Sequence, residues 1–181
     1  YVVTKIPRFT FEKFSSSEAV LGTSMKSVGE AMAIGRNFKG SLQKALISLE
    51  TGFSGLDQIF KLNVKQIEKK LRENIPNKIL LVGEAFRKKI NINKIHKLSK
   101  IDFWFLGQIK EIIDVENEIK KKGLPKNFNS FNFVKSIGFS DKKLSELSNI
   151  KEEVVRKKRS ALKIFPVYKK VDTCAAEFKS F

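Results

Sequence analysis

The chain has 181 residues, of which 41% are hydrophobic and 30% charged, and its formal net charge is +17. This length is sufficient for one domain with a buried core. One cysteine and one histidine exclude a disulfide framework and a structural zinc site with about four ligands. No run approaches the roughly 20 apolar residues of a membrane-spanning helix, so we expect a soluble, cytoplasmic protein. The chain starts at Tyr1 rather than Met, and we interpret it as a piece of a longer protein.

The positive charge comes from 36 Lys and Arg residues against 19 Asp and Glu. A charge of this sign attracts phosphate backbones and anionic lipids. The basic residues are mostly lysines, however, and they are spread along the chain without an arginine-rich block. This distribution favours a solvated lysine surface over a nucleic-acid footprint. A basic helical module that binds RNA or DNA is the alternative function.

The first 36 residues predict two strand regions. "YVVTKIPRFTFEKF" (1–14) places alternate residues on opposite faces, and Pro7 indicates an edge or a bend. A loop rich in Ser and Gly follows. "MKSVGEAMAIGR" (25–36) predicts a second strand region that Gly35 closes.

From Asn37 the apolar residues follow a helical period. A helix that ends before Gly52 carries an apolar stripe at i, i+3, i+4 and i+7. The stripe consists of Leu42, Ala45, Leu46 and Leu49. Its three leucines, Leu42, Leu46 and Leu49, are a candidate self-association face. The competing interpretation is that the stripe is part of the core.

Further helices follow with short connectors, in a pattern that predicts a mainly α fold. Capping boxes are predicted at Asn63 with Gln66 and at Ser99 with Asp102. The second box opens the longest helix, from Ile101 to about Lys122, which "KKKG" ends. Its expected buried seam is Ile101, Phe105, Ile109, Ile112, Ile113, Glu116 and Ile119. The last helix, within 149–163, has a predicted apolar stripe of Ile150, Val154, Ala161 and Leu162, on which Lys158 also falls.

No complete active site can be assembled from these residues. Cys174 and His96 could form a nucleophile and base pair. Cys174 in "DTCAAEF" lies among small apolar residues without a basic neighbour that would activate its thiol, so we interpret it as a small buried residue. "RKKR" (156–159) is interpreted as a solvated helix face rather than an RNA-binding patch, and metal-binding and phosphate-cradling motifs are absent.

Three stretches closely resemble the carbamoyl-phosphate synthetase large subunit, in the same order and at similar spacing. They are "YVVTKIPRFTFEKF", "MKSVGEAMAIGRNFKGSLQKALISLE" and "PVYKKVDTCAAEF", with lesser similarities over 84–112 and 138–147. The resemblance implies an enzyme with two ATP-grasp halves that makes carbamoyl phosphate from bicarbonate, ATP and glutamine-derived ammonia. It also implies a helical oligomerisation domain between the halves.

By this resemblance, 1–36 is the C-terminal edge of the first ATP-grasp half, 37–165 the oligomerisation domain and 166–181 a connector toward the second half. ATP and Mg (or Mn) would bind outside the piece, which alone would be inactive. Its expected partners are a glutaminase subunit or domain and further copies of itself. Glu12 resembles a glutamate near the passage that carbamate takes between the two sites.

The sequence departs from the family at four positions. Lys39 and Gly40 stand where acidic residues are usual, so we expect weaker support of the first helical turn. Lys158 replaces a usual Leu, and Phe165 a common His. These departures put the packing of the last helix and the details of oligomerisation in question.

Overall fold

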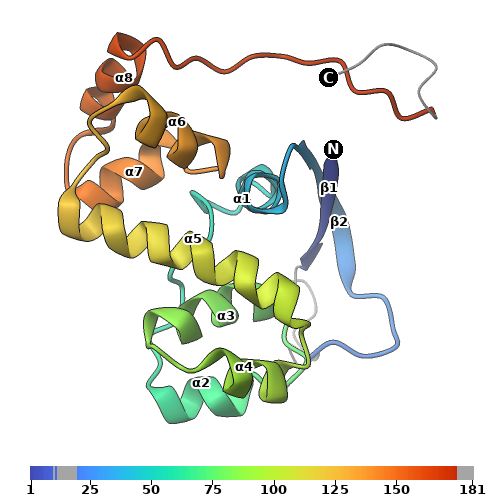
Figure 1. Cartoon of the computed structure of the whole chain (residues 1–181). Helices are drawn as coiled ribbons and strands as arrows, with labels where there is room; N and C mark the ends of the chain where they lie inside the picture. The colour runs from blue at the N-terminus through green and yellow to red at the C-terminus, as the bar shows by residue number, and fades with distance from the viewer. Residues whose placement is uncertain (10, 12–19, 175–181) are drawn as a thin grey trace.

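The computed structural model describes residues 1–9, 11 and 20–174, which comprise a two-stranded sheet and a helical body (Figure 1). The strands are β1 (Val2–Phe9) and β2 (Ser27–Gly35), and the helices are α1 (Phe38–Ser48), α2 (Val64–Lys70), α3 (Lys78–Arg87), α4 (Ile92–Ser99), α5 (Phe103–Lys122), α6 (Phe128–Ser136), α7 (Asp141–Ser148) and α8 (Glu152–Ala161). The predicted mainly α fold with a short β-containing lead is therefore confirmed.

The two strands form an antiparallel ladder that begins with Val2 opposite Gly35 and becomes irregular between Arg8 and Phe9. Pro7 pairs opposite Glu30, a position that tolerates a missing N–H because each strand of a two-stranded sheet has one open edge. One face of the sheet packs on α1. The Thr4 and Ser41 hydroxyls lie 2.7 Å apart across this contact.

A close approach between α1 and α6 explains the glycine at position 40. A Cβ at Gly40 would lie 2.9 Å from the Ser136 carbonyl oxygen, so a larger residue would force the two helices apart. Asn37 caps α1: its side-chain oxygen accepts the Gly40 N–H at 2.7 Å, and its amide donates to the Ser136 carbonyl at 3.2 Å. The first turn lacks acidic residues, as expected, but this cap supports it.

The longest helix, α5, crosses the middle of the molecule, with α2, α3 and α4 on one side and α6, α7 and α8 on the other (Figure 1). The buried side chains of α5 are Leu106, Ile109, Ile112, Ile113, Glu116 and Ile119. The prediction that Phe105 belongs to the buried seam is wrong, because Phe105 is exposed and Leu106 is buried in its place.

The start of α5 also differs from the prediction. Asp102 is the N-cap and accepts the Trp104 N–H at 2.8 Å. Ser99 instead ends α4, and its hydroxyl accepts the Ile101 N–H at 3.2 Å in the connecting turn. The predicted Ser99–Asp102 box is therefore split between two helices. The Asn63–Gln66 box and the Gly123 stop are confirmed.

The predicted stripe of α8 is half right: Ile150 and Leu162 pack against the core, but the stripe residues between them do not. Val155 is buried, whereas Val154, Lys158 and Ala161 are exposed. The helix begins at Glu152. It faces α7 with Val155 and, one turn later, with Arg159, which pairs with Asp141. Lys158 therefore imposes no cost of burial.

Candidate functional site

The leucine stripe lies within the chain's own core. Leu42 and Leu46 are 3% and 2% exposed, and Leu49 is half-buried against the same core. These positions favour the interpretation that the stripe is part of the core, because a second copy could reach Leu42 and Leu46 only if the core opened. Glu12, the residue proposed to lie near a carbamate passage, falls outside the described residues.

Cys174 and His96 do not act as a pair in the described structure. Cys174 is exposed, so the prediction of a buried residue is wrong. Beyond Ile164 the chain extends away from α8, which leaves the thiol outside the helical core (Figure 1). The His96 Nδ1 lies 2.8 Å from the Ile101 carbonyl oxygen, and its ring stacks on Phe103 with 4.0 Å between centroids. His96 therefore stabilises the turn between α4 and α5.

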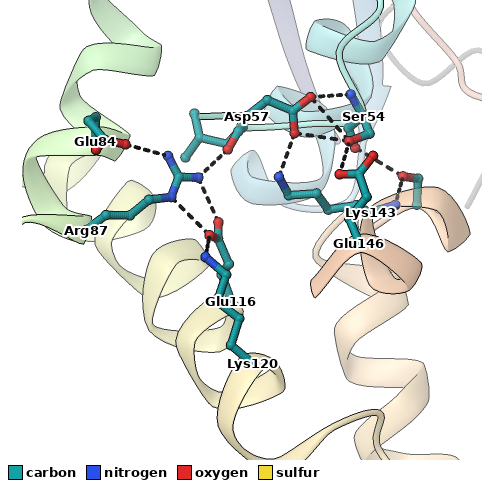
Figure 2. A network of polar contacts seen from close by, with 10 residues as sticks. Ser54, Asp57, Glu84, Arg87, Glu116, Lys120, Lys143 and Glu146 are labelled. Atoms are coloured by element: carbon teal, nitrogen blue, oxygen red, sulfur yellow. Dashed lines mark hydrogen bonds and ion pairs between the residues drawn. The ribbon is translucent and has the colours of Figure 1, made fainter. Parts of the chain in front are cut away.

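The most heavily buried charges of the described chain meet between α3 and α5 (Figure 2). Arg87 donates from Nε to Glu116 Oε1 at 3.0 Å and from Nη2 to Oε2 at 2.7 Å, a bidentate pair. Its Nη1 lies 3.6 Å from Glu84 Oε2. Nη2 also donates to the Leu56 carbonyl. Arg87 thus holds two buried carboxylates and the loop that precedes α2.

The same loop is held from its other side by α7 (Figure 2). Lys143 Nζ donates to Asp57 Oδ1 at 2.6 Å, and the other oxygen of Asp57 accepts the Ser54 N–H at 2.6 Å. The Ser54 hydroxyl lies 3.2 Å from Glu146 Oε2. The loop therefore connects α3 and α5 to α7 through charged side chains.

Electrostatics favour the charged form of Glu116. Burial alone would raise the pKa of this carboxyl, but the hydrogen bonds and charge of Arg87, together with the hydrogen bond of Lys120, hold the pKa below its ordinary value. A carboxylate that stays ionised and paired in this way is suited to fixing helices rather than to proton transfer.

A second charged cluster joins α6, α7 and α8. Asp141 accepts from Lys135 at 2.8 Å and from Arg159 at 3.0 Å. Arg159 also donates to the Ile164 carbonyl at 2.8 Å, which fixes the chain where it leaves α8. Burial opposes the charge of Asp141, but these two cations lower the pKa of its carboxyl overall. Arg159, predicted to lie on a solvated face, is therefore internal.

The charged side chains of both clusters are engaged in contacts within the chain. Among the described residues, no three or more His, Cys, Asp or Glu side chains gather in a way that could hold a metal ion. Within the same residues, no helix is long and apolar enough to cross a membrane. Three of the arginines, Arg87, Arg156 and Arg159, are paired with carboxylates inside the chain, which leaves them less available to phosphates.

Sequence reasoning missed Arg87 and Asp57 because their partners lie far away in the chain. One signal was available: Glu116 falls on an apolar seam of α5, and a carboxylate at such a position requires a buried cation. The periodicity identified the buried face but not the residue opposite it.

The sequence was compared with protein-family models and with curated proteins. Residues 30–163 match the family model described as "Carbamoyl-phosphate synthetase large chain, oligomerisation domain". The chain belongs to this family. The carbamoyl phosphate synthase large chain of Brucella melitensis is 48% identical over 99% of this chain and 16% of its own length. The arginine-specific large chain of Oryza sativa, named as chloroplastic, is 48% identical with coverage of 99% and 16%. The large chain of Vibrio cholerae is 47% identical with coverage of 99% and 17%.

The chain thus spans about a sixth of the length of these curated relatives. The family resemblance expected from the sequence is confirmed. The matched residues, 30–163, contain the C-terminal part of β2 and all the helices from α1 to α8.

Proposed function

We propose that this chain is the segment of a carbamoyl-phosphate synthase large chain that joins two ATP-using halves, holds them at a fixed spacing and mediates association between copies. The observation that carries the proposal is the match along 99% of the chain to large chains six times its length. Such a match fits an internal segment whose neighbours carry the chemistry.

The architecture supports a spacer role because both flanks are fixed to the helical body. At the start, the Thr4–Ser41 contact joins β1 to α1, and a Cβ at Gly35 would lie 3.0 Å from the Ser41 nitrogen. At the end, Arg159 holds the Ile164 carbonyl while it pairs with Asp141. The buried charges around Arg87 connect the helices between these flanks. Motion of one half would thus be transmitted through packed elements.

The complete enzyme would make carbamoyl phosphate from bicarbonate, ATP and glutamine-derived ammonia, for arginine and pyrimidine synthesis in the cytoplasm. We place ATP and Mg (or Mn) in ATP-grasp halves on either side of this segment. A glutaminase subunit or domain would supply the ammonia. The segment alone would not turn over ATP.

A chimera tests this proposal. The matching segment of the Vibrio cholerae large chain, a 47% identical relative, would be replaced by this chain, and carbamoyl phosphate formed from bicarbonate, ATP and ammonia would be measured. We expect activity within about tenfold of the parent enzyme, because two segments that are 47% identical should hold the flanking halves at the same spacing. A matched chimera with Leu46→Asp, which puts a charge into the core, should lose activity. A folded unmodified chimera without activity would refute the spacer role.

A further inference from the structure

An exposed aromatic patch lies where α5 begins. It consists of Phe103, Trp104 and Phe105, which are 45%, 55% and 43% exposed, together with the half-buried Phe38 at the start of α1. The ring centroids of Phe38 lie 5.4 Å from Trp104 and 5.3 Å from Phe105, and those of Trp104 and Phe105 lie 5.0 Å apart, all edge to face. This contact geometry orders the patch before any partner arrives.

The patch exposes an apolar area close to that of the largest patch on a typical soluble monomer. An aromatic side chain presents about 200 Å², so the three exposed residues together leave about 300 Å² uncovered. Contiguous apolar areas of this size are often functional on a soluble protein. A stable interface buries about 800 Å² on each partner, so the patch would form its centre and polar neighbours its rim.

Gly107 provides a second, independent observation. It lies in the second turn of α5, four residues after Phe103 and three after Trp104, and therefore on the face that these side chains share. Glycine in a helix is unfavourable relative to alanine. A Cβ at Gly107 would meet no atom within 4 Å beyond its chain neighbours and the backbone of its own helix, so packing against other elements does not require the glycine. The free space would suit the close approach of a helix from outside.

We propose that the aromatic patch and Gly107 are the face through which two copies of this chain associate, with α5 of one copy lying across α5 of the other. This inference rests on the proposed function, since it assigns the association of the oligomerisation domain to one surface. In a two-fold interface the same residues face each other, and edge-to-face aromatic rings are compatible with that arrangement. A glycine at the crossing lets two helix axes approach at short distance.

The distribution of charge along α5 also favours a second copy of this chain as the partner of the patch. Two copies that each carry +17 repel one another over most of their surfaces. The turns of α5 beyond Gly107 carry both signs, however: Lys110 pairs with Asp114, and Glu111 pairs with Lys39 of α1. In an antiparallel crossing, the acidic residues of one α5 can face the basic residues of the other. An anionic partner would instead be drawn to the lysine-rich remainder of the surface.

Sedimentation equilibrium of the 181-residue chain and three variants tests the proposal. Trp104→Ala removes the largest exposed ring and should raise the dimer Kd about tenfold or more. Gly107→Gln adds a side chain that the monomer can accommodate, so it should raise the Kd by at least the same factor without lowering the melting temperature. Phe133→Ala is the matched control, because Phe133 is a 52% exposed aromatic residue on α6, and its Kd should equal that of the unchanged chain.

Two results would overturn the proposal. One is a chain that stays monomeric at every concentration. The other is a Trp104→Ala or Gly107→Gln variant that dimerises as the unchanged chain does. If, in addition, Gly107→Gln impairs the active chimera, other parts of the large chain cover the patch. Neither result bears on the spacer role, because that role is tested by the activity of the chimera and not by sedimentation.

Discussion

Charged residues are usually exposed and large apolar residues buried, but the two ends of α5 show the opposite. Toward its C-terminal end the helix buries a charge, Glu116, which Arg87 and Lys120 pair. At its N-terminal end it exposes Phe103, Trp104 and Phe105. A buried ion pair contributes little net stability but strongly penalises the loss of either partner. The part of an aromatic side chain that stays in water adds no burial energy until another surface covers it. The difference indicates that one end fixes the fold and the other serves contacts outside it.

The largest expected effect comes from breaking the buried end. Arg87→Met removes the cation that Glu84 and Glu116 share, leaves Glu116 with Lys120 alone and should lower the free energy of unfolding by about 3–5 kcal/mol. Urea unfolding measures this loss. Arg156→Met is the control: Arg156 also pairs with a glutamate, Glu152, but on the surface, so the change should cost less than about 1 kcal/mol. Equal losses in the two variants would mean that Arg87 has no special role.

A core substitution separates apolar burial from buried charge. Leu46→Ala should cost about 2–5 kcal/mol because it opens a cavity in the core. Its dimer Kd, after correction for unfolded protein, should not change. A stable, folded Leu46→Ala chain that fails to associate would instead indicate that the leucine stripe is the self-association face.

Acid should weaken the charged clusters. The carboxyls of Glu116 and Asp141 have pKa values below their ordinary values of 4.5 and 3.8, so their contribution to stability is fully present above those values. It is lost as the pH falls through the lower, folded-state pKa values. Urea unfolding between pH 7 and pH 3 should therefore show a decline that steepens below about pH 4.5. Asp141→Asn should make this decline shallower, and an unchanged slope would contradict the assignment.

The smallest expected effect is a gain. Gly107→Ala should raise the free energy of unfolding of the monomer by about 0.5–1 kcal/mol, because alanine favours the helix and its Cβ meets open space. Thermal unfolding at a concentration well below the dimer Kd measures this gain. A loss of stability would show that the position is crowded in the monomer, and the argument for an external partner would fail.

Local signals in the sequence predicted much of the fold. The box of Asn63 with Gln66 and the stop at Gly123 depend on neighbouring residues and were confirmed. Periodicity failed on α8, where Val155 rather than Val154 is buried, because a helix of three turns permits two adjacent stripes. Only the packing against α7 selects between them.

The candidate site was less predictable. The pair of Arg87 with Glu116 spans 29 positions, and a single sequence does not show which distant residues meet. The aromatic patch was missed for a related reason. Phe105 was assigned to the core by its period, but the next residue, Leu106, is the buried one, and Phe105 contacts Phe38 at the surface.

Trp104 offers the most direct test, because it is the only tryptophan of the chain and lies at the centre of the exposed end of α5. Its fluorescence and its quenching by acrylamide can be followed in the unmodified chain as the concentration rises. We predict a shift of the emission to shorter wavelength and a fall in quenching, in step with the dimer fraction measured by sedimentation. An indole that stays equally exposed while the chain associates would contradict our assignment of this end of α5.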